Sequence, residues 1–244
     1  MTFRSLVSFA VMMTMKTLAR VFYRLTPKYL NQTVSNEDWK NVKLLIFLHH
    51  TSLFEPIYLG VVPNAFVWKL SKRMVAPMAT KTGDRPIVGK IFKFMGPAIV
   101  SITRKRDASW SHFLNEIHPD SVITIVPEGR MMRAPGMDAY GHRMSVKGGV
   151  AEILHKLDSG KILFAYSGGL HHIQYPGQWP HIFKEAKINI EFKNLMEYKR
   201  EIGFEHASFK EFKDAVIADL ERRKEENCPF IGPHSPQEQK SSAS

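Results

Sequence analysis

Short apolar runs alternate with helix-like segments between residues 41 and 195, and this alternation constrains the fold more than any other feature of the sequence. The runs are rich in β-branched and aromatic residues and cover 43–48, 98–103, 122–126, 161–166 and 186–192. Apolar residues at helical spacing fall at about 53–62, 86–95, 109–118 and 147–158. The pattern predicts a single α/β domain with a central, mostly parallel or mixed sheet flanked by helices.

The end of the chain is predicted to hold one more helix and a tail. Ser208 and Glu211 have the spacing of a capping box, and the apolar residues that follow share one face, so we expect a helix to about residue 227. Residues 229–244 are rich in Pro, Ser and Gln and are expected to form a flexible tail. The domain itself is therefore expected to span residues 31–228.

The net charge of the chain limits the classes of partner that it is expected to bind. Lys and Arg number 34 against 23 Asp and Glu, a formal net charge of +11, which favours an anionic membrane, an acidic substrate or carrier, or nucleic acid. No zinc-finger spacing or RNA-binding signature is present, so no nucleic-acid partner is expected. The single cysteine, Cys228, cannot form an internal disulfide and has no adjacent histidine, which argues against a cysteine nucleophile.

Residues 1–30 are predicted to associate with a membrane. The apolar run 6–15 covers only about half of a bilayer core, so we expect it not to span, and no signal-peptidase cleavage pattern follows it. Lys16, Arg20 and Arg24 recur every four residues and would form a basic stripe near anionic headgroups. An ordinary surface helix packed on the domain is the alternative.

The most informative motif for chemistry follows the first predicted strand. His50 and Glu55 are five residues apart, so they meet only if His50 lies in a turn and Glu55 in the first turn of a helix that Ser52 caps. A carboxylate on one imidazole nitrogen would leave the other free to take a proton from a hydroxyl. The alternative is that Ser52 and Glu55 form only a capping box in a protein that binds a membrane or carrier without catalysis.

Two further clusters lie at predicted strand ends. Glu128, Gly129 and Arg130 offer an acceptor, a close backbone approach and a bidentate donor, with Arg133 shortly after, which suits a hydroxylated, phosphorylated ligand. Arg104 begins a short basic run after strand 98–103. Either cluster can also be a solvated charge run or a turn with an internal ion pair.

These motifs together resemble a known family. His50-x4-Glu55, the segment GPAIVSITR ending at Arg104, Pro127-Glu128-Gly129 and Lys147-Gly148 follow the order and spacing of the lysophospholipid / 1-acylglycerol-3-phosphate acyltransferases over residues 41 to 170. The resemblance implies acyl transfer from acyl-CoA or acyl-carrier protein to a lysophospholipid, without a metal or cofactor. It also implies an N-terminal membrane-binding element, and we expect the protein to lie on the cytoplasmic face of the membrane.

The resemblance also implies roles for single residues. His50 would be the base, oriented by Glu55, while Arg104 and the Glu128-Gly129-Arg130 loop would bind the acceptor. The family usually has Asp at the position of Glu55, and Asn at that of His49. It also usually has Thr-Arg-Ser after Glu-Gly, so the sequence leaves open whether Arg130 or Arg133 binds phosphate. Backbone amides from Thr51 to Phe54 are expected to stabilise the oxyanion.

Two other kinds of enzyme remain possible from the sequence. Ser167 lies in an Ala-x-Ser-Gly-Gly run at a strand end, which resembles the nucleophile elbow of a serine esterase, although the residues that follow are poor helix formers. His49, His50, His171 and His172 form two pairs that would bind zinc or iron if they converged.

Overall fold

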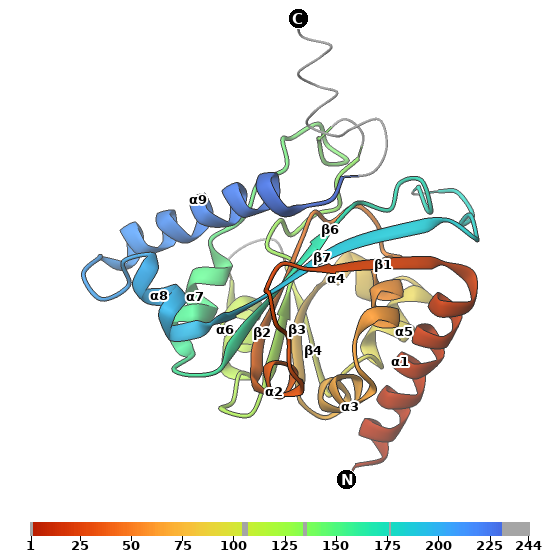
Figure 1. Ribbon diagram of the computed structural model, residues 1–244, viewed down its shortest axis with the longest axis horizontal. Helices are drawn as coiled ribbons and strands as arrows, with labels where there is room; N and C mark the ends of the chain where they lie inside the picture. The colour runs from red at the N-terminus through yellow and green to blue at the C-terminus, as the bar shows by residue number, and fades with distance from the viewer. Residues whose placement is uncertain (1, 104–106, 134–135, 176, 231–244) are drawn as a thin grey trace, which may run out of the picture.

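The computed structural model describes residues 2–103, 107–133, 136–175 and 177–230. Its strands are β1 (Arg24–Tyr29), β2 (Val42–Leu48), β3 (Met74–Ala79), β4 (Ala98–Ile102), β5 (Val122–Ile125), β6 (Lys161–Ser167) and β7 (Glu185–Asn194). They form a seven-stranded sheet in the order β1-β7-β6-β2-β5-β3-β4 (Figure 1). Only β6 and β7 pair antiparallel, and the other described pairs are parallel. The predicted α/β domain with a mostly parallel sheet is confirmed.

Helices cover both faces of this sheet (Figure 1). One face packs against α1 (Phe3–Phe22), α2 (Asn36–Asn41), the 3-10 helix η1 (Glu55–Val61) and α3 (Asn64–Arg73). The other packs against α6 (Ala108–Asn115), α7 (Gly149–Lys156), α8 (Leu195–Glu201) and α9 (Phe209–Asn227). The short helices α4 (Thr80–Gly83) and α5 (Val88–Lys93) lie between β3 and β4.

The central strand β2 shows why the predicted runs are apolar throughout. Leu44 and Ile46 point into the core on the side of α7 and α9, while Phe47 points into the core on the side of α1 and α3. A strand buried on both faces needs apolar residues at every position rather than at alternate ones. Each of the predicted strands is therefore present, with bounds that shift by one or two residues.

Two strands, β1 and β3, lie where none was predicted. β1 pairs only with β7, so it is an edge strand that tolerates Pro27 and exposed polar residues. β3 contains Pro77, which argues against a central strand, but β5 pairs only with Met74 and Val75 at its start. The segment 53–62, expected to be an α-helix, is instead the 3-10 helix η1 with Pro56 in its first turn.

The expected orientation of the N-terminal helix is wrong. Lys16 is buried and donates to the Val62 carbonyl, and Arg20 Nε donates to the Gly60 carbonyl at 2.8 Å. These carbonyls lie at the end of η1, where the last turn of a helix leaves acceptors without backbone partners. Lys16 and Arg20 therefore contact the domain on the same side of α1 as the buried residues Met12 and Ala19, and only part of the apolar surface of the helix faces outward.

Several large apolar side chains of α1 are exposed: Phe3 at 82%, Val21 at 60%, Leu18 at 50% and Leu6 at 43%. The helix is long and apolar enough to cross a membrane by length and composition. At the other end of the chain, α9 begins at the predicted capping box of Ser208 and Glu211 and ends at Asn227. The tail predicted at 229–244 lies almost entirely outside the described residues.

Candidate active site

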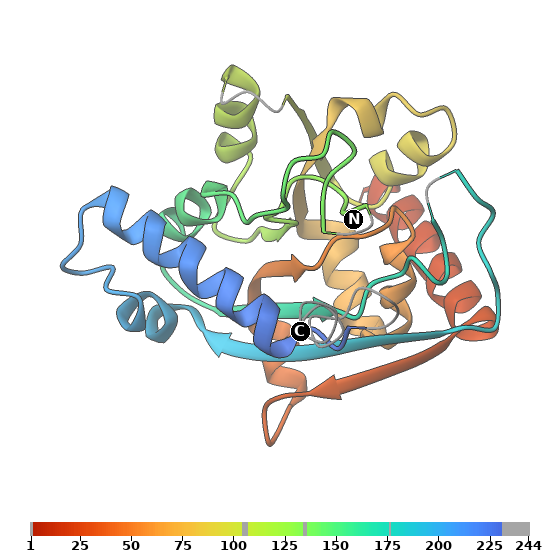
Figure 2. The ribbon, with the colours of Figure 1, turned by 90° about the horizontal axis from the view of Figure 1, so that it is seen from above.

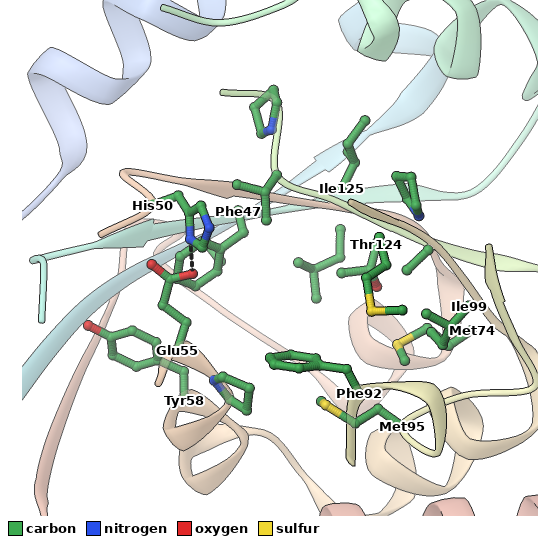
Figure 3. A pocket seen from close by; sticks show the side chains of 18 of the residues that line it. Phe47, His50, Glu55, Tyr58, Met74, Phe92, Met95, Ile99, Thr124 and Ile125 are labelled. Atoms are coloured by element: carbon green, nitrogen blue, oxygen red, sulfur yellow. Dashed lines mark hydrogen bonds and ion pairs between the residues drawn. The ribbon is translucent and has the colours of Figure 1, made fainter. Parts of the chain in front are cut away.

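The turn after β2 holds His50 and Glu55 together. His50 Nδ1 lies 2.5 Å from Glu55 Oε2, and both side chains are largely buried (Figure 3). The other carboxylate oxygen, Oε1, accepts the amide of Thr51 at 2.7 Å and that of Ser52 at 3.3 Å. Glu55 therefore orients the imidazole and closes the turn at once, so its two expected roles coexist.

This hydrogen bond fixes the chemistry of the imidazole. A carboxylate accepts, so Nδ1 carries the proton and Nε2 holds the lone pair when the ring is neutral. Among the described residues Nε2 of His50 has no hydrogen-bond partner. Burial by itself lowers the pKa of His50, but the charge and hydrogen bond of Glu55, together with the charge of Glu128, raise it above the ordinary value. The arrangement is that of a general base.

Glu128, which follows β5, holds the same turn through hydrogen bonds to its backbone. Its Oε2 accepts the amide of His50 at 2.7 Å and its Oε1 accepts that of His49 at 3.3 Å. Lys224 of α9 lies 3.8 Å from Oε1. Burial raises the pKa of the Glu128 carboxyl. The hydrogen bond from the His50 amide and the charge of Lys224 offset part of that rise. Both oxygens, expected to face the acceptor, are thus engaged with the backbone that carries the base.

His49 is the strained point of the turn. Its φ of 68° lies in the left-handed region, which Asn, Asp and His adopt more readily than other side chains. Its Nδ1 lies 3.0 Å from the carbonyl oxygen of Ser167, and burial lowers its pKa to about 4. His49 is therefore a neutral residue that ties the turn to the end of β6 and is distinct in role from His50.

A cavity of about 690 Å³ opens beside the His50 and Glu55 pair. Its wall is mostly apolar and extends under the sheet toward β3, β4 and α5 (Figure 3). The apolar residues include Phe47, Met74, Phe92, Met95, Ile99 and Ile125. One hydroxyl, that of Thr124, is buried in this wall without a hydrogen-bond partner among the described residues. The base therefore lies at one end of a space suited to a hydrocarbon chain.

Basic side chains line part of the same cavity as the base. Arg130 and Lys147 line the large cavity, and with Arg143 they also line a smaller one of about 270 Å³. Arg130 is ion-paired with the buried carboxylate of Asp138, which also accepts the amides of Tyr140 and His142. This bond fixes the guanidinium and leaves Arg143 and Lys147 as the less constrained cations.

The structure brings most of the predicted residues together. Gly129 lies in the left-handed region with φ 65° and lines the cavity beside Arg130. Arg133 does not line either cavity, so of the two candidate arginines Arg130 is the one that shares a cavity with His50. Arg104 lies outside the described residues.

Sequence reasoning gave no role to Lys147, Arg143 or Asp138. Lys147 belongs to the Lys147-Gly148 motif, to which the sequence alone assigned no chemical role. Its position just before α7 is the feature of the sequence that could have indicated one. Arg143 and Asp138 lie in an irregular segment with no periodicity to place them. A bond from the Met132 amide to the His50 carbonyl at 2.7 Å ties the preceding part of this segment to the base.

The expected oxyanion donors are mostly occupied. The amides of Thr51 and Ser52 donate to Glu55, and that of Phe54 donates to the Ser52 hydroxyl at 3.0 Å. Of these four residues, Leu53 is the one whose amide has no partner within the described part of the chain. Three of the amides expected to stabilise the oxyanion are therefore engaged, and that of Leu53 is left.

The serine esterase reading is contradicted by the geometry. Ser167 is fully buried, its hydroxyl lies 3.1 Å from that of Tyr58, and it accepts the Gly169 amide at 3.0 Å. Turns rather than a helix follow it, whereas a nucleophile elbow needs an exposed hydroxyl that leads into a helix. Burial also raises the pKa of the Cys228 thiol well above its ordinary value, which keeps the thiol protonated.

The histidine pairs do not gather into a metal site in the described residues, where no group of three or more His, Cys, Asp or Glu side chains is placed to hold an ion. His171 Nε2 lies 2.9 Å from the Met132 carbonyl, and His172 Nε2 lies 2.6 Å from that of Glu185. Each of these imidazoles thus uses one nitrogen on the backbone.

Comparison with known proteins shows which fold this chain shares. No protein-family model matches the sequence, and no curated protein matches it. Among solved structures, the 1-acyl-sn-glycerophosphate (LPA) acyltransferase PlsC from Thermotoga maritima is similar, with a TM-score of 0.53 and 17% sequence identity. The match covers 93% of this chain and 84% of the other. The chain has the fold of that acyltransferase. The resemblance drawn from the motifs is thus confirmed for the fold, and the activity is argued from the site itself.

Proposed function

We propose that the protein is an acyltransferase that moves a fatty acyl group from an acyl thioester to the hydroxyl of a lysophospholipid. The observation that carries this proposal is the His50 imidazole, bonded to Glu55 at 2.5 Å, with its other nitrogen open at the end of an apolar cavity. A general base beside a space for a hydrocarbon chain suits the transfer of an acyl chain to an alcohol. The fold shared with PlsC agrees with this reading.

The mechanism needs no covalent enzyme intermediate. Nε2 of His50 removes the proton of the acceptor hydroxyl as its oxygen attacks the thioester carbonyl, while Glu55 stabilises the imidazolium that forms. The tetrahedral intermediate then expels the thiolate of the donor, which takes that proton from the His50 imidazolium and leaves as the thiol. The amide of Leu53 is the available donor of this turn for the oxyanion.

The basic residues beside His50 suit the anionic head of the acceptor. Lys147 and Arg143 would bind its phosphate, and Arg130, held by Asp138, would donate from a fixed direction. The net charge of +11 also suits an acidic donor, either acyl-CoA or acyl-carrier protein. The acyl chain would lie in the cavity lined by residues such as Phe92 and Met95.

The exposed apolar side chains of α1 support binding to a membrane. We propose that this contact lies at the cytoplasmic face of the membrane. Leu18 and Val21 are half or more exposed, and the first acidic residue of the chain is Glu37. Apolar side chains on a segment without negative charge are favourable at an anionic bilayer surface. A lysophospholipid would then reach the site from the lipid phase.

The proposal is tested by a panel of donors and acceptors. Purified protein is incubated with acyl-CoA, or with acyl-carrier protein, and with lysophosphatidic acid or other lysolipids, and the lipids are identified by mass spectrometry. The proposal predicts a diacyl product with at least one pair. Hydrolysis of the donor without a diacyl product, or no reaction with any pair, would contradict it.

A further inference from the structure

The segment before β7 carries an exposed apolar tip, and nothing in the site accounts for it. Trp179 is 91% exposed, Phe183 is 69% exposed and Ile182 is 48% exposed. These are among the most exposed large apolar residues that the structure describes. Water-exposed aromatic groups on one short segment are unfavourable for a protein surface unless a partner covers them. We call residues 177–184 the tryptophan loop.

The tryptophan loop is fastened to the end of α1. The amide of Phe183 donates to the carbonyl of Phe22 at 2.6 Å, and the rings of these two residues lie 6.1 Å apart. Both views place this loop on the same side of the molecule as α1, beside its C-terminal end (Figures 1 and 2). The exposed residues Leu18 and Val21 lie in the last two turns of the same helix end.

The backbone of the loop is held in an unfavourable conformation. Phe183 has a φ of 60°, in the left-handed region that an aromatic residue rarely adopts. The bond to Phe22 and the pairing of the Arg24 amide with the Lys184 carbonyl at 3.0 Å hold this conformation in place. The backbone that carries Phe183 is therefore held next to the end of α1.

The charges around the loop suit an anionic surface. From His171 to Lys184 the chain contains no acidic residue, and His181 and Lys184 are the titratable groups of the loop itself. Arg24, which follows α1, lies beside Lys184 and pairs in register with Glu185, the first acidic residue after the loop. Trp favours the interface between water and hydrocarbon, where its ring is buried and its N–H stays hydrated.

We infer that the tryptophan loop is a second membrane contact, which inserts Trp179 and Phe183 into the headgroup region of an anionic bilayer. This extends the membrane contact proposed for α1, with which the loop is continuous. Two contacts at one end of α1 fix the rotation of the domain on the membrane, which a single helix does not. The domain would thus have one orientation toward the lipid phase.

Intrinsic fluorescence tests this inference, because Trp179 is the most exposed of the four tryptophans. The difference between the spectra of wild type and Trp179→Phe isolates its emission. With phosphatidylglycerol vesicles we expect that emission to shift to shorter wavelength and to be quenched by brominated lipid. Unchanged emission while the protein binds the vesicles would overturn the inference and leave the contact of α1 standing.

Vesicle partitioning gives an independent measure. Trp179→Ala is expected to weaken binding to phosphatidylglycerol vesicles by about tenfold or more, the scale for burying one large apolar side chain. Phe209→Ala is the matched control, since Phe209 is also exposed but begins α9 on the opposite side of the molecule (Figure 1). Equal loss in both variants would overturn the inference.

Two outcomes separate the causes of a failure. A blue shift of Trp179 with rising protein concentration and no lipid would mean that a second copy of the chain covers the loop, and it would contradict a membrane contact. Normal lipid-dependent shifts in a protein that transfers no acyl group would refute the proposed activity and keep the membrane contact.

Discussion

Changing the length of the side chain at position 55 gives a specific test of the proposed base, because the acyltransferases that the motifs resemble usually have Asp at the position of Glu55. Replacing Glu55 by Asp retracts the carboxylate by about one carbon bond, roughly 1.5 Å. The present distance from Nδ1 to Oε2 is 2.5 Å, so without movement of the turn the two atoms would lie roughly 4 Å apart, beyond hydrogen-bond range. The variant should therefore lose the orientation of His50.

The loss can be estimated from the bond itself. A hydrogen bond to a charged group contributes about 1.5–3 kcal/mol, which corresponds to a fall in rate of about 10- to 150-fold. Glu55→Gln keeps the length and removes the charge, so it serves as the matched variant. Its amide can accept one of the bonds now made to His50 and Thr51 but not both, so we expect a loss at least as large.

The pH profile separates orientation from general damage. Because Glu55 raises the pKa of His50, and a base must be neutral, kcat/KM should rise with pH through a limb above pH 6.5. In Glu55→Gln this limb should move to lower pH. The same raised pKa stabilises the fold below pH 6.5, a contribution that is lost as the pH rises through the pKa of the folded state.

The assay is acyl transfer to a lysolipid across this pH range, with the imidazole of His50 followed by NMR titration. Wild-type activity in Glu55→Asp, together with an unchanged pH profile, would refute the argument that this turn requires the longer side chain.

Three further predictions follow from other contacts. Glu128→Gln should lower the free energy of unfolding by about 1–3 kcal/mol in urea titrations, because its amide nitrogen would face a buried backbone N–H; a neutral result would contradict its hold on the turn. Lys147→Ala should raise KM for an anionic lysolipid with little change in kcat, whereas Lys40→Ala, on an exposed side chain, should change neither. Thr124→Val should raise stability by about 1 kcal/mol, since its hydroxyl is buried and has no partner among the described residues; a loss would mean that the hydroxyl is satisfied.

The central pair was within reach of the sequence because its geometry is local. His50 and Glu55 are separated by one turn, and the need for a carboxylate to meet an imidazole there limits the backbone to few conformations. The departure at His49 also has a local reason. The family usually has Asn there, and a φ of 68° favours Asn or His over other side chains. The change therefore conserves the turn.

The role of Glu128 was out of reach because it depends on which strands are neighbours. β2 and β5 are far apart in the chain, and their pairing places the residue after β5 against the amides of His49 and His50. Spacing along the sequence carries no information on that contact. A carboxylate next to Gly129 and Arg130 therefore suggested a ligand, and not a support for the base.

The prediction of which side of α1 faces outward failed for a similar reason. Lys16 and Arg20 form a basic stripe by helical spacing, and a membrane surface is the usual partner of such a stripe. The carbonyls of Gly60 and Val62 at the end of η1 bind these side chains instead. Lys16 and Arg20 thus lie on the inward side of α1 with Met12 and Ala19, where an unpredicted 3-10 helix supplies acceptors for them.

The most direct test of the account compares the same substitution at two adjacent positions. His50→Asn and His49→Asn are each assayed for transfer of a labelled acyl group to the lysolipid that wild type accepts. We predict a loss of a hundredfold or more for His50→Asn, the scale of losing a general base, and a much smaller loss for His49→Asn. Equal losses, or full activity in His50→Asn, would contradict the assignment of His50 as the base.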